Sequence, residues 1–178
     1  MNKKFISGGC SFTFGHELSD DDKGKKPSKQ SWANKLRCDA EGIKQTDYDY
    51  LCSARPGTGN SGIARRTFQT VTDHKPEDIS CVVVMWSFLS RYDWAMPRHK
   101  NLEDTRWVTM TPWDTTQGQA EAFRKLSNSE PHKDEWKARR EQMKQTGVRD
   151  FADSLYKFAA NQYHELYLSW KSIIWLQN

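Results

Sequence analysis

The chain has 178 residues, of which 36% are hydrophobic and 28% charged, and its formal net charge is +4 at pH 7. This length suits one domain, and the basic residues alternate with acidic ones instead of forming a stripe, so nothing indicates a nucleic-acid partner. The apolar runs are too short for a signal peptide or a membrane span, and we expect no membrane partner.

The first half of the chain alternates predicted strands and helices. Short apolar or alternating runs predict strands at 4–7, 47–52 and 78–87. A helix capped by Ser31 is expected to end near residue 40, and a second helix is expected over 61–72. The run at 78–87 is almost continuously apolar, which is typical of a strand covered on both faces. This order predicts right-handed crossovers and an α/β fold with a parallel sheet.

The second half interrupts this alternation. Residues 97–146 are rich in tryptophan and charge with little clear period, so we expect an insertion or cap that is helical from 135 to 145. Apolar residues at helical spacing predict one long amphipathic helix over 149–170. The apolar run 172–177 is interpreted as a further strand. A parallel sheet rarely ends on such a strand, so we interpret 1–178 as one domain that forms the front part of a larger fold.

Three loops are expected to meet at one edge of this sheet. Ligands of open parallel sheets bind at the carboxyl ends of the strands, where this chain has the loops 8–15, 55–62 and 87–93. The first loop places Ser11 on a strand-to-helix turn. A hydroxyl there could attack an acyl carbon while main-chain N–H groups hold the oxyanion. The alternative interpretation is a tight corner built from small residues.

Neither the phosphate-loop pattern G-x-x-x-x-G-K-[ST] nor the esterase pattern G-x-S-x-G occurs in the chain. The stretches "GGCSFTFGHEL", "ARPGTGNSGIARR" and "VVVMWSFLSRYDW" together resemble the SGNH, or GDSL-like, hydrolase superfamily, with most likeness to its bacterial and phage branch. The resemblance implies a three-layer α/β/α sandwich with a flavodoxin-like parallel sheet. It also implies the strand order 2-1-3-4 and a serine nucleophile.

The resemblance assigns roles to individual residues. Gly9-Cys10-Ser11 matches the Gly-Asp-Ser triplet of the family, with Cys in place of the acid, so Ser11 is the expected nucleophile. The expected oxyanion hole consists of Ser11, Gly57 and Ser87, where Gly59 is an alternative to Gly57 and Ser87 stands where the family has Asn. The further candidates for substrate binding are Asn60 and Arg91.

One part of the family pattern is missing. The family takes its acid and base from a late Asp-x-x-His, and no such sequence occurs here. His16 is close to Ser11 in sequence, but its place beyond Gly15 favours a contact in the following loop. We therefore expect an ester or acyl hydrolase for O-acylated small molecules or carbohydrates, if a base is supplied. The alternatives are a non-catalytic or truncated SGNH-like binding or assembly module and, on fold layout alone, a nucleotide binder.

Four cysteines, at positions 10, 38, 52 and 81, form no C-x-x-C pair and are interpreted as reduced thiols of a cytoplasmic protein. No pair of metal-ligating residue types has a convincing spacing, so we expect no metal and no cofactor. A sheet that ends at 172–177 would expose that strand as an edge. This predicts a homodimer across the edge.

Overall fold

The computed structural model describes residues 3–21, 25–39, 48–98, 101–126 and 133–177. The chain divides into two compact units, which are described separately. Unit 1 comprises Met1–Leu89 and Tyr167–Asn178, and unit 2 comprises Ser90–Leu166. Unit 2 thus includes the segment 97–146 that the sequence sets apart, and it extends beyond that segment on both sides. None of the helices in the described part of the chain is long and apolar enough to cross a membrane.

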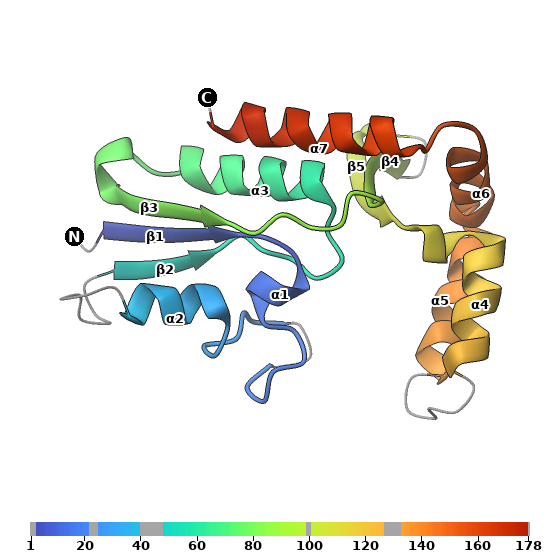
Figure 1. Ribbon diagram of the computed structural model, residues 1–178, viewed down its shortest axis with the longest axis horizontal. Coiled ribbons are helices and arrows are strands. Elements are labelled where there is room, and N and C mark those ends of the chain that lie inside the picture. The colour runs from blue at the N-terminus through green and yellow to red at the C-terminus, as the bar shows by residue number, and fades with distance from the viewer. Residues whose placement is uncertain (1–2, 22–24, 40–47, 99–100, 127–132, 178) are drawn as a thin grey trace. The chain divides into compact units, whose positions relative to one another are not determined.

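Unit 1 alternates strands and helices, as predicted. Its elements in chain order are β1 (Lys3–Gly8), α1 (Ser11–Phe14), α2 (Trp32–Asp39), β2 (Tyr48–Cys52), α3 (Asn60–Thr72), the short 3-10 helix η1 (Pro76–Asp78) and β3 (Ile79–Val84). The three strands are parallel and lie in the order β2-β1-β3 (Figure 1). The predicted α/β class and the predicted parallel sheet are confirmed.

The strand order explains where the helices lie. The chain steps from β1 to β2 in one direction and from β2 across β1 to β3 in the other. Right-handed crossovers therefore put the two connecting helices on opposite faces of the sheet. Accordingly α2 packs on β2, α3 packs on β1, and the sheet lies between the two helices (Figure 1).

The interior of unit 1 combines apolar and polar side chains. Ile6 of β1 and Ile63 of α3 are buried, and burying one such side chain contributes about 1.5–3 kcal/mol. Next to Ile6, the buried Ser7 donates a hydrogen bond to the Tyr50 hydroxyl at 2.9 Å. The Ser53 hydroxyl donates to the Ser7 carbonyl at 3.0 Å, which ties the chain beyond β2 to β1.

Strand β3 differs from its predicted burial. Cys81 is exposed, and Val82 retains 39% of its accessible surface. Successive residues of a strand point to opposite faces, so both faces of β3 are accessible. The prediction of a strand covered on both faces is wrong: β3 is an edge strand whose side chains are accessible on both faces.

The predicted strand at 172–177 is also wrong, because these residues end the helix α7 (Gln162–Gln177). The Ser172 hydroxyl donates to the Leu168 carbonyl one turn earlier, at 2.9 Å. The part of α7 that belongs to unit 1 packs on α3, where the rings of Trp175 and Phe68 lie 4.7 Å apart. The predicted strand order is therefore confirmed for three strands and has no fourth strand at the end of the chain.

Unit 2 begins with an antiparallel hairpin that the sequence analysis did not predict. Its elements are β4 (Tyr92–Arg98), β5 (Asn101–Met110), the short 3-10 helix η2 (Pro112–Asp114), α4 (Thr116–Leu126), α5 (Lys133–Gln145), α6 (Val148–Phe158) and the first turns of α7. The helix expected at 135–145 is confirmed by α5. The helix α4 was not predicted.

The single helix predicted over 149–170 is divided into α6 and α7. Asn161 causes the division, because its side-chain oxygen accepts a hydrogen bond from the His164 N–H at 3.0 Å. This is the contact by which asparagine caps a helix start, and it competes with continuation of the preceding helix. The apolar residues at helical spacing therefore do not form one face, and Phe158 is 78% exposed.

A hydrophobic cluster holds unit 2 together. It is formed by the buried side chains Met110, Met143, Val148 and Ala152. The Tyr156 hydroxyl lies beside it, 2.6 Å from the Ser90 carbonyl and 3.0 Å from the Met110 carbonyl. Burial raises the pKa of Tyr156, so this hydroxyl remains a donor over the whole physiological range.

Candidate functional site

The loops that follow the three strands of unit 1 meet at one edge of the sheet. The N–H of Met85, beyond β3, donates to the Gly8 carbonyl at 3.0 Å. The N–H of Arg55, beyond β2, donates to the Gly9 carbonyl at 3.2 Å. The turn after the central strand β1 is thus held from both sides, and this arrangement agrees with the expectation from the sequence.

Ser11 is the first residue of α1 and follows this turn directly. Its side chain is half-buried, whereas the preceding Cys10 retains only 2% of its accessible surface. The Ser11 carbonyl accepts the Gly15 N–H at 2.8 Å, which closes the single turn of the helix. Among the residues that the structure describes, none forms a hydrogen bond with the Ser11 hydroxyl, so this hydroxyl is available to a ligand.

The two glycines before Cys10 are explained by close packing. A side chain at Gly8 would collide with Thr67 of α3, and one at Gly9 would collide with Thr13 of α1. A Cβ at position 9 would also lie only 3.2 Å from the Met85 carbonyl oxygen. The tight-corner interpretation therefore accounts for the glycine pair, and Ser11 has to be judged on its own surroundings.

Gly57 lies in the loop after β2 in the left-handed region, with φ of 79°. A Cβ there would meet no atom within 4 Å, so Gly57 is needed for its backbone angle and not for lack of space. Within the described part of the chain, its N–H forms no hydrogen bond. Gly59, the alternative, has extended backbone and a carbonyl that accepts the Ile63 N–H at 2.9 Å as the N-cap of α3. The open N–H favours Gly57 as the oxyanion donor.

Asn60 holds the third loop in place. Its side-chain oxygen accepts the Ser87 N–H at 2.7 Å, and its amide nitrogen lies 3.3 Å from the Ser87 carbonyl. The same nitrogen donates to the Ser169 hydroxyl of α7 at 2.8 Å. Asn60 is only 4% exposed. Both polar groups of the proposed substrate-binding residue are therefore engaged within the protein, and its role is to position Ser87.

This contact also limits what Ser87 can do. Its N–H is directed to Asn60 and is not available to a bound oxyanion. Its side chain is half-buried in the loop after β3. If Ser87 assists an oxyanion, the donor is therefore its hydroxyl and not its main chain.

The arginines singled out by the sequence have different surroundings. Arg91 is half-buried and belongs to unit 2. Arg66 of α3 donates through Nε to the Ser53 carbonyl at 2.8 Å and thereby fixes the start of the loop after β2. Burial and the neighbouring Arg55 and Arg65 lower the pKa of Arg66 from its usual value.

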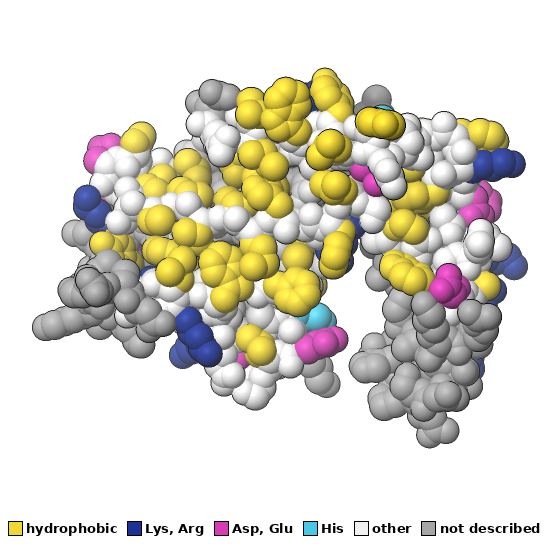
Figure 2. All heavy atoms as spheres, in the orientation of Figure 1, with side chains coloured by type: hydrophobic (Ala, Val, Ile, Leu, Met, Phe, Trp, Pro, Cys, Tyr) yellow, Lys and Arg dark blue, Asp and Glu magenta, His cyan; other side chains and the backbone are white. Residues whose placement is uncertain are grey.

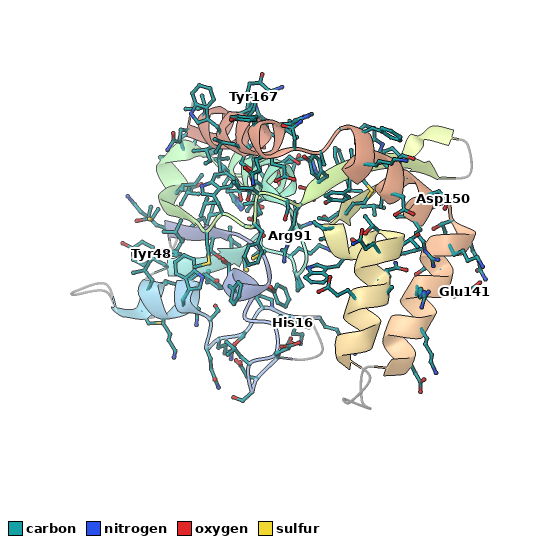
Figure 3. The ribbon with its side chains drawn as sticks, turned by 45° about the vertical axis from the view of Figure 1, so that its right-hand side comes forward. His16, Tyr48, Arg91, Glu141, Asp150 and Tyr167 are labelled. Atoms are coloured by element: carbon teal, nitrogen blue, oxygen red, sulfur yellow. The ribbon has the colours of Figure 1, made fainter. Side chains whose placement is uncertain are left out.

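His16 makes the loop contact that its position predicts. In the turn after α1 (Figure 3), its Nδ1 atom lies 2.9 Å from the Asp21 carboxylate, which also accepts the Glu17 N–H at 2.9 Å. Gly15 and Glu17 have left-handed backbone, which gives this turn its shape. The contact between His16 and Ser11 is a main-chain hydrogen bond of 3.0 Å. No histidine side chain in the described ranges forms a hydrogen bond with the Ser11 hydroxyl.

The remaining described histidines also form no hydrogen bond with the Ser11 hydroxyl. In unit 2 the His164 ring lies edge-on to the Tyr92 ring, with centroids 6.2 Å apart. His74 follows α3, and His99 and His132 lie outside the described residues. Within those residues, no group of three or more His, Cys, Asp or Glu side chains could hold a metal ion. The four cysteines are free thiols.

The site therefore has a serine hydroxyl without a described partner and two candidate main-chain donors. The Ser11 N–H is one donor, since the first N–H groups of a helix have no partner inside it. The Gly57 N–H is the other. Comparison with known proteins adds no further assignment: no protein-family model, no curated protein and no solved structure matches this chain.

Proposed function

We propose that the protein is an ester or acyl hydrolase with Ser11 as its nucleophile. The observation that carries the proposal is the half-buried Ser11 hydroxyl, without a described partner, at the carboxyl end of the central strand. The loops after β2 and β3 are hydrogen-bonded to Gly9 and Gly8, in the turn that precedes Ser11. The proposed substrates, O-acylated small molecules or carbohydrates, rest on the likeness of the loops to SGNH hydrolases.

In the proposed reaction, Ser11 Oγ forms a bond to the acyl carbon and its proton passes to a base. The carbonyl oxygen becomes an oxyanion, held by the N–H groups of Ser11 and Gly57 with help from the Ser87 hydroxyl. The alkoxide leaves as an alcohol after taking up the proton, and water then hydrolyses the acyl-enzyme. Removing one oxyanion donor typically slows such reactions by about 10²–10³. The proposal takes the nucleophile and the donors from described residues, none of which is a base in contact with Ser11.

Labelling with a fluorophosphonate tests this proposal, because the reagent reacts much faster with an activated serine than with an ordinary hydroxyl group. Intact-mass spectrometry should find one adduct per chain, and Ser11→Ala should abolish it. Ser19→Ala is the matched control, since Ser19 is exposed and its hydroxyl hydrogen-bonds to Gln30 at 3.1 Å, away from the site. An adduct that survives in Ser11→Ala would contradict the proposed nucleophile.

The second candidate is a non-catalytic binding or assembly module of the same fold. It is favoured by the pairing of His16 with Asp21, since this ring nitrogen is engaged in a loop contact. A serine without a base is a weak nucleophile at neutral pH. A folded protein that forms no adduct, and whose ligand affinity is the same in Ser11→Ala, would favour the module over the hydrolase.

A further inference from the structure

The free side of β3 is unusual for the edge of a sheet. The β3 edge, residues 79–85, reads "ISCVVVM" and contains neither a charged residue nor proline. Proteins usually protect edge strands with lysine, proline or a covering segment, because an unprotected edge pairs with other strands. Figure 2 shows hydrophobic side chains gathered over the strands of unit 1. In the part of the chain that the structure describes, no strand pairs with this side of β3.

The register of β3 identifies the main-chain groups at this edge. The Met85 N–H points to β1, where it bonds the Gly8 carbonyl, and Val83 lies opposite Ser7. Alternate residues of a strand direct their N–H and C=O groups to opposite sides. Val83 and Met85 therefore face β1, whereas Val82 and Val84 present their main-chain groups to the free side. Ser80 lies at an irregularity of the β1–β3 register, where Lys4 pairs with Ile79 and Phe5 pairs with Cys81.

We propose that the β3 edge pairs with the same edge of a second copy of this chain, antiparallel, about a two-fold axis at Val82. Val82 then lies opposite Val82 of the second copy, and Ser80 lies opposite Val84. The central Val82 pair is a hydrogen-bonded pair with two bonds, and the two flanking Ser80–Val84 pairs extend the ladder to the register irregularity of β3. The two sheets form one continuous sheet in the order β2-β1-β3-β3-β1-β2. This inference does not depend on the chemistry of Ser11.

Charge and symmetry argue for a second copy as the occupant. An uncharged strand lies against itself without like-charge repulsion, and its valines are well suited to cross-strand pairing. Two-fold symmetric dimers are also the commonest oligomers. A standard interface buries about 800 Å² per partner, more than a short strand provides. Phe88, 62% exposed, and Leu89, 45% exposed, lie three and four residues beyond the edge and are the nearest exposed large apolar side chains after it that could enlarge the interface.

Light scattering coupled to size exclusion tests the pairing. The wild-type chain should elute with twice the mass of one chain, and Val82→Lys should shift it to the mass of one chain. Two lysines would then lie opposite each other across the two-fold axis. Val82→Thr keeps the β-branched shape and should remain dimeric. Phe158→Lys, at a 78% exposed position of unit 2, should also remain dimeric and controls for loss of exposed apolar surface.

Cysteine cross-linking tests the register without a charge at the edge. A two-fold axis at Val82 puts the exposed Cys81 opposite Val83 of the second copy in a non-hydrogen-bonded pair, where side chains approach most closely. Oxidised Val83→Cys should therefore form a covalent dimer through Cys81, and Cys81→Ser in the same chain should abolish it. A wild-type chain that keeps the mass of one chain at high concentration, or a dimer that survives Val82→Lys and forms no such cross-link, would overturn the proposal. A monomer that pairs only with a strand of another protein would also overturn it.

Discussion

At the scale of single residues, Gly57 illustrates how a backbone angle can be required without a crowded neighbourhood. Its φ of 79° disfavours residues with a Cβ, although a Cβ would meet open space. We expect Gly57→Ala to lower the free energy of unfolding by about 1–2 kcal/mol. Gly57→Asn should cost less, since asparagine tolerates this region. Urea unfolding measures both, and equal losses in the two variants would contradict a purely conformational role.

Tyr50 gives the protein a defined sensitivity to alkali. Burial, followed by the electrostatic effect of the nearby Cys52, raises the pKa of Tyr50 to about 12. The folded-state pKa lies above the unfolded value of about 10. The contribution of the neutral phenol to stability is therefore complete below about pH 10 and is lost as pH rises towards 12. The melting temperature should decline less steeply over this range in Tyr50→Phe than in the wild type. If the melting temperatures of the two proteins fall equally steeply with pH, Tyr50 is not the group responsible.

At the scale of elements, Asn60 joins α3, the loop after β3 and α7. Asn60→Ala removes the acceptor of the partly buried Ser87 N–H, and the loss of this hydrogen bond should cost about 0.5–1.5 kcal/mol. Asn60→Asp keeps the acceptor for the Ser87 N–H and loses the donor to Ser169 and to the Ser87 carbonyl, so it separates the acceptor contact from the donor contacts. If Asn60 positions the loop, Asn60→Ala should also slow fluorophosphonate labelling more than Asn60→Asp does. Equal labelling rates in all three proteins would assign Asn60 a role in stability alone.

The hydrophobic cluster of unit 2 yields a prediction for that unit. Met110 is fully buried, and its truncation leaves a cavity against Met143 and Ala152. Met110→Ala should destabilise the protein by roughly 2–5 kcal/mol in urea unfolding. Phe158→Ala, at an exposed position, should change stability by no more than about 0.5 kcal/mol. A mild effect of Met110→Ala would show that this cluster does not limit the stability of unit 2.

The elements also show how far the sequence predicts the fold. β1, β2, α2 and α3 follow from local pattern, because each has its own period or cap. The hairpin β4–β5 did not follow from local pattern. Tyr92 and Trp94 alternate with other residues as in a strand, but Pro97 argues against a strand there. The end of α7 was misassigned because a short apolar run fits a strand and a helix equally well.

Some features of the candidate site could likewise be predicted from the sequence, and others could not. The meeting of the three loops could be predicted, because the carboxyl ends of parallel strands share an edge. The role of Asn60 could not, since its partner Ser169 is 109 positions away in the chain. The contact of His16 with Asp21 lies within one loop, and the position of His16 beyond Gly15 already favoured such a contact. Local contacts were thus accessible to sequence reasoning, and long-range ones were not.

At the scale of the whole molecule, unit 1 combines a candidate site and an unprotected edge on different parts of one small sheet. The site follows the carboxyl ends of the strands, and the edge runs along β3. The predicted homodimer across an exposed edge remains a proposal, but the strand concerned is β3 and not 172–177. Val82→Lys should therefore abolish dimerisation without abolishing the Ser11 adduct, which separates assembly from chemistry.

The measurement that tests the central claim most directly is intact-mass analysis after fluorophosphonate treatment of the wild type, Ser11→Ala and Ser19→Ala. The account predicts one adduct per chain in the wild type and in Ser19→Ala, and none in Ser11→Ala. That result would show that Ser11 is activated and that a base acts on it. A folded wild-type protein without an adduct would contradict the hydrolase and leave the binding or assembly module as the better description.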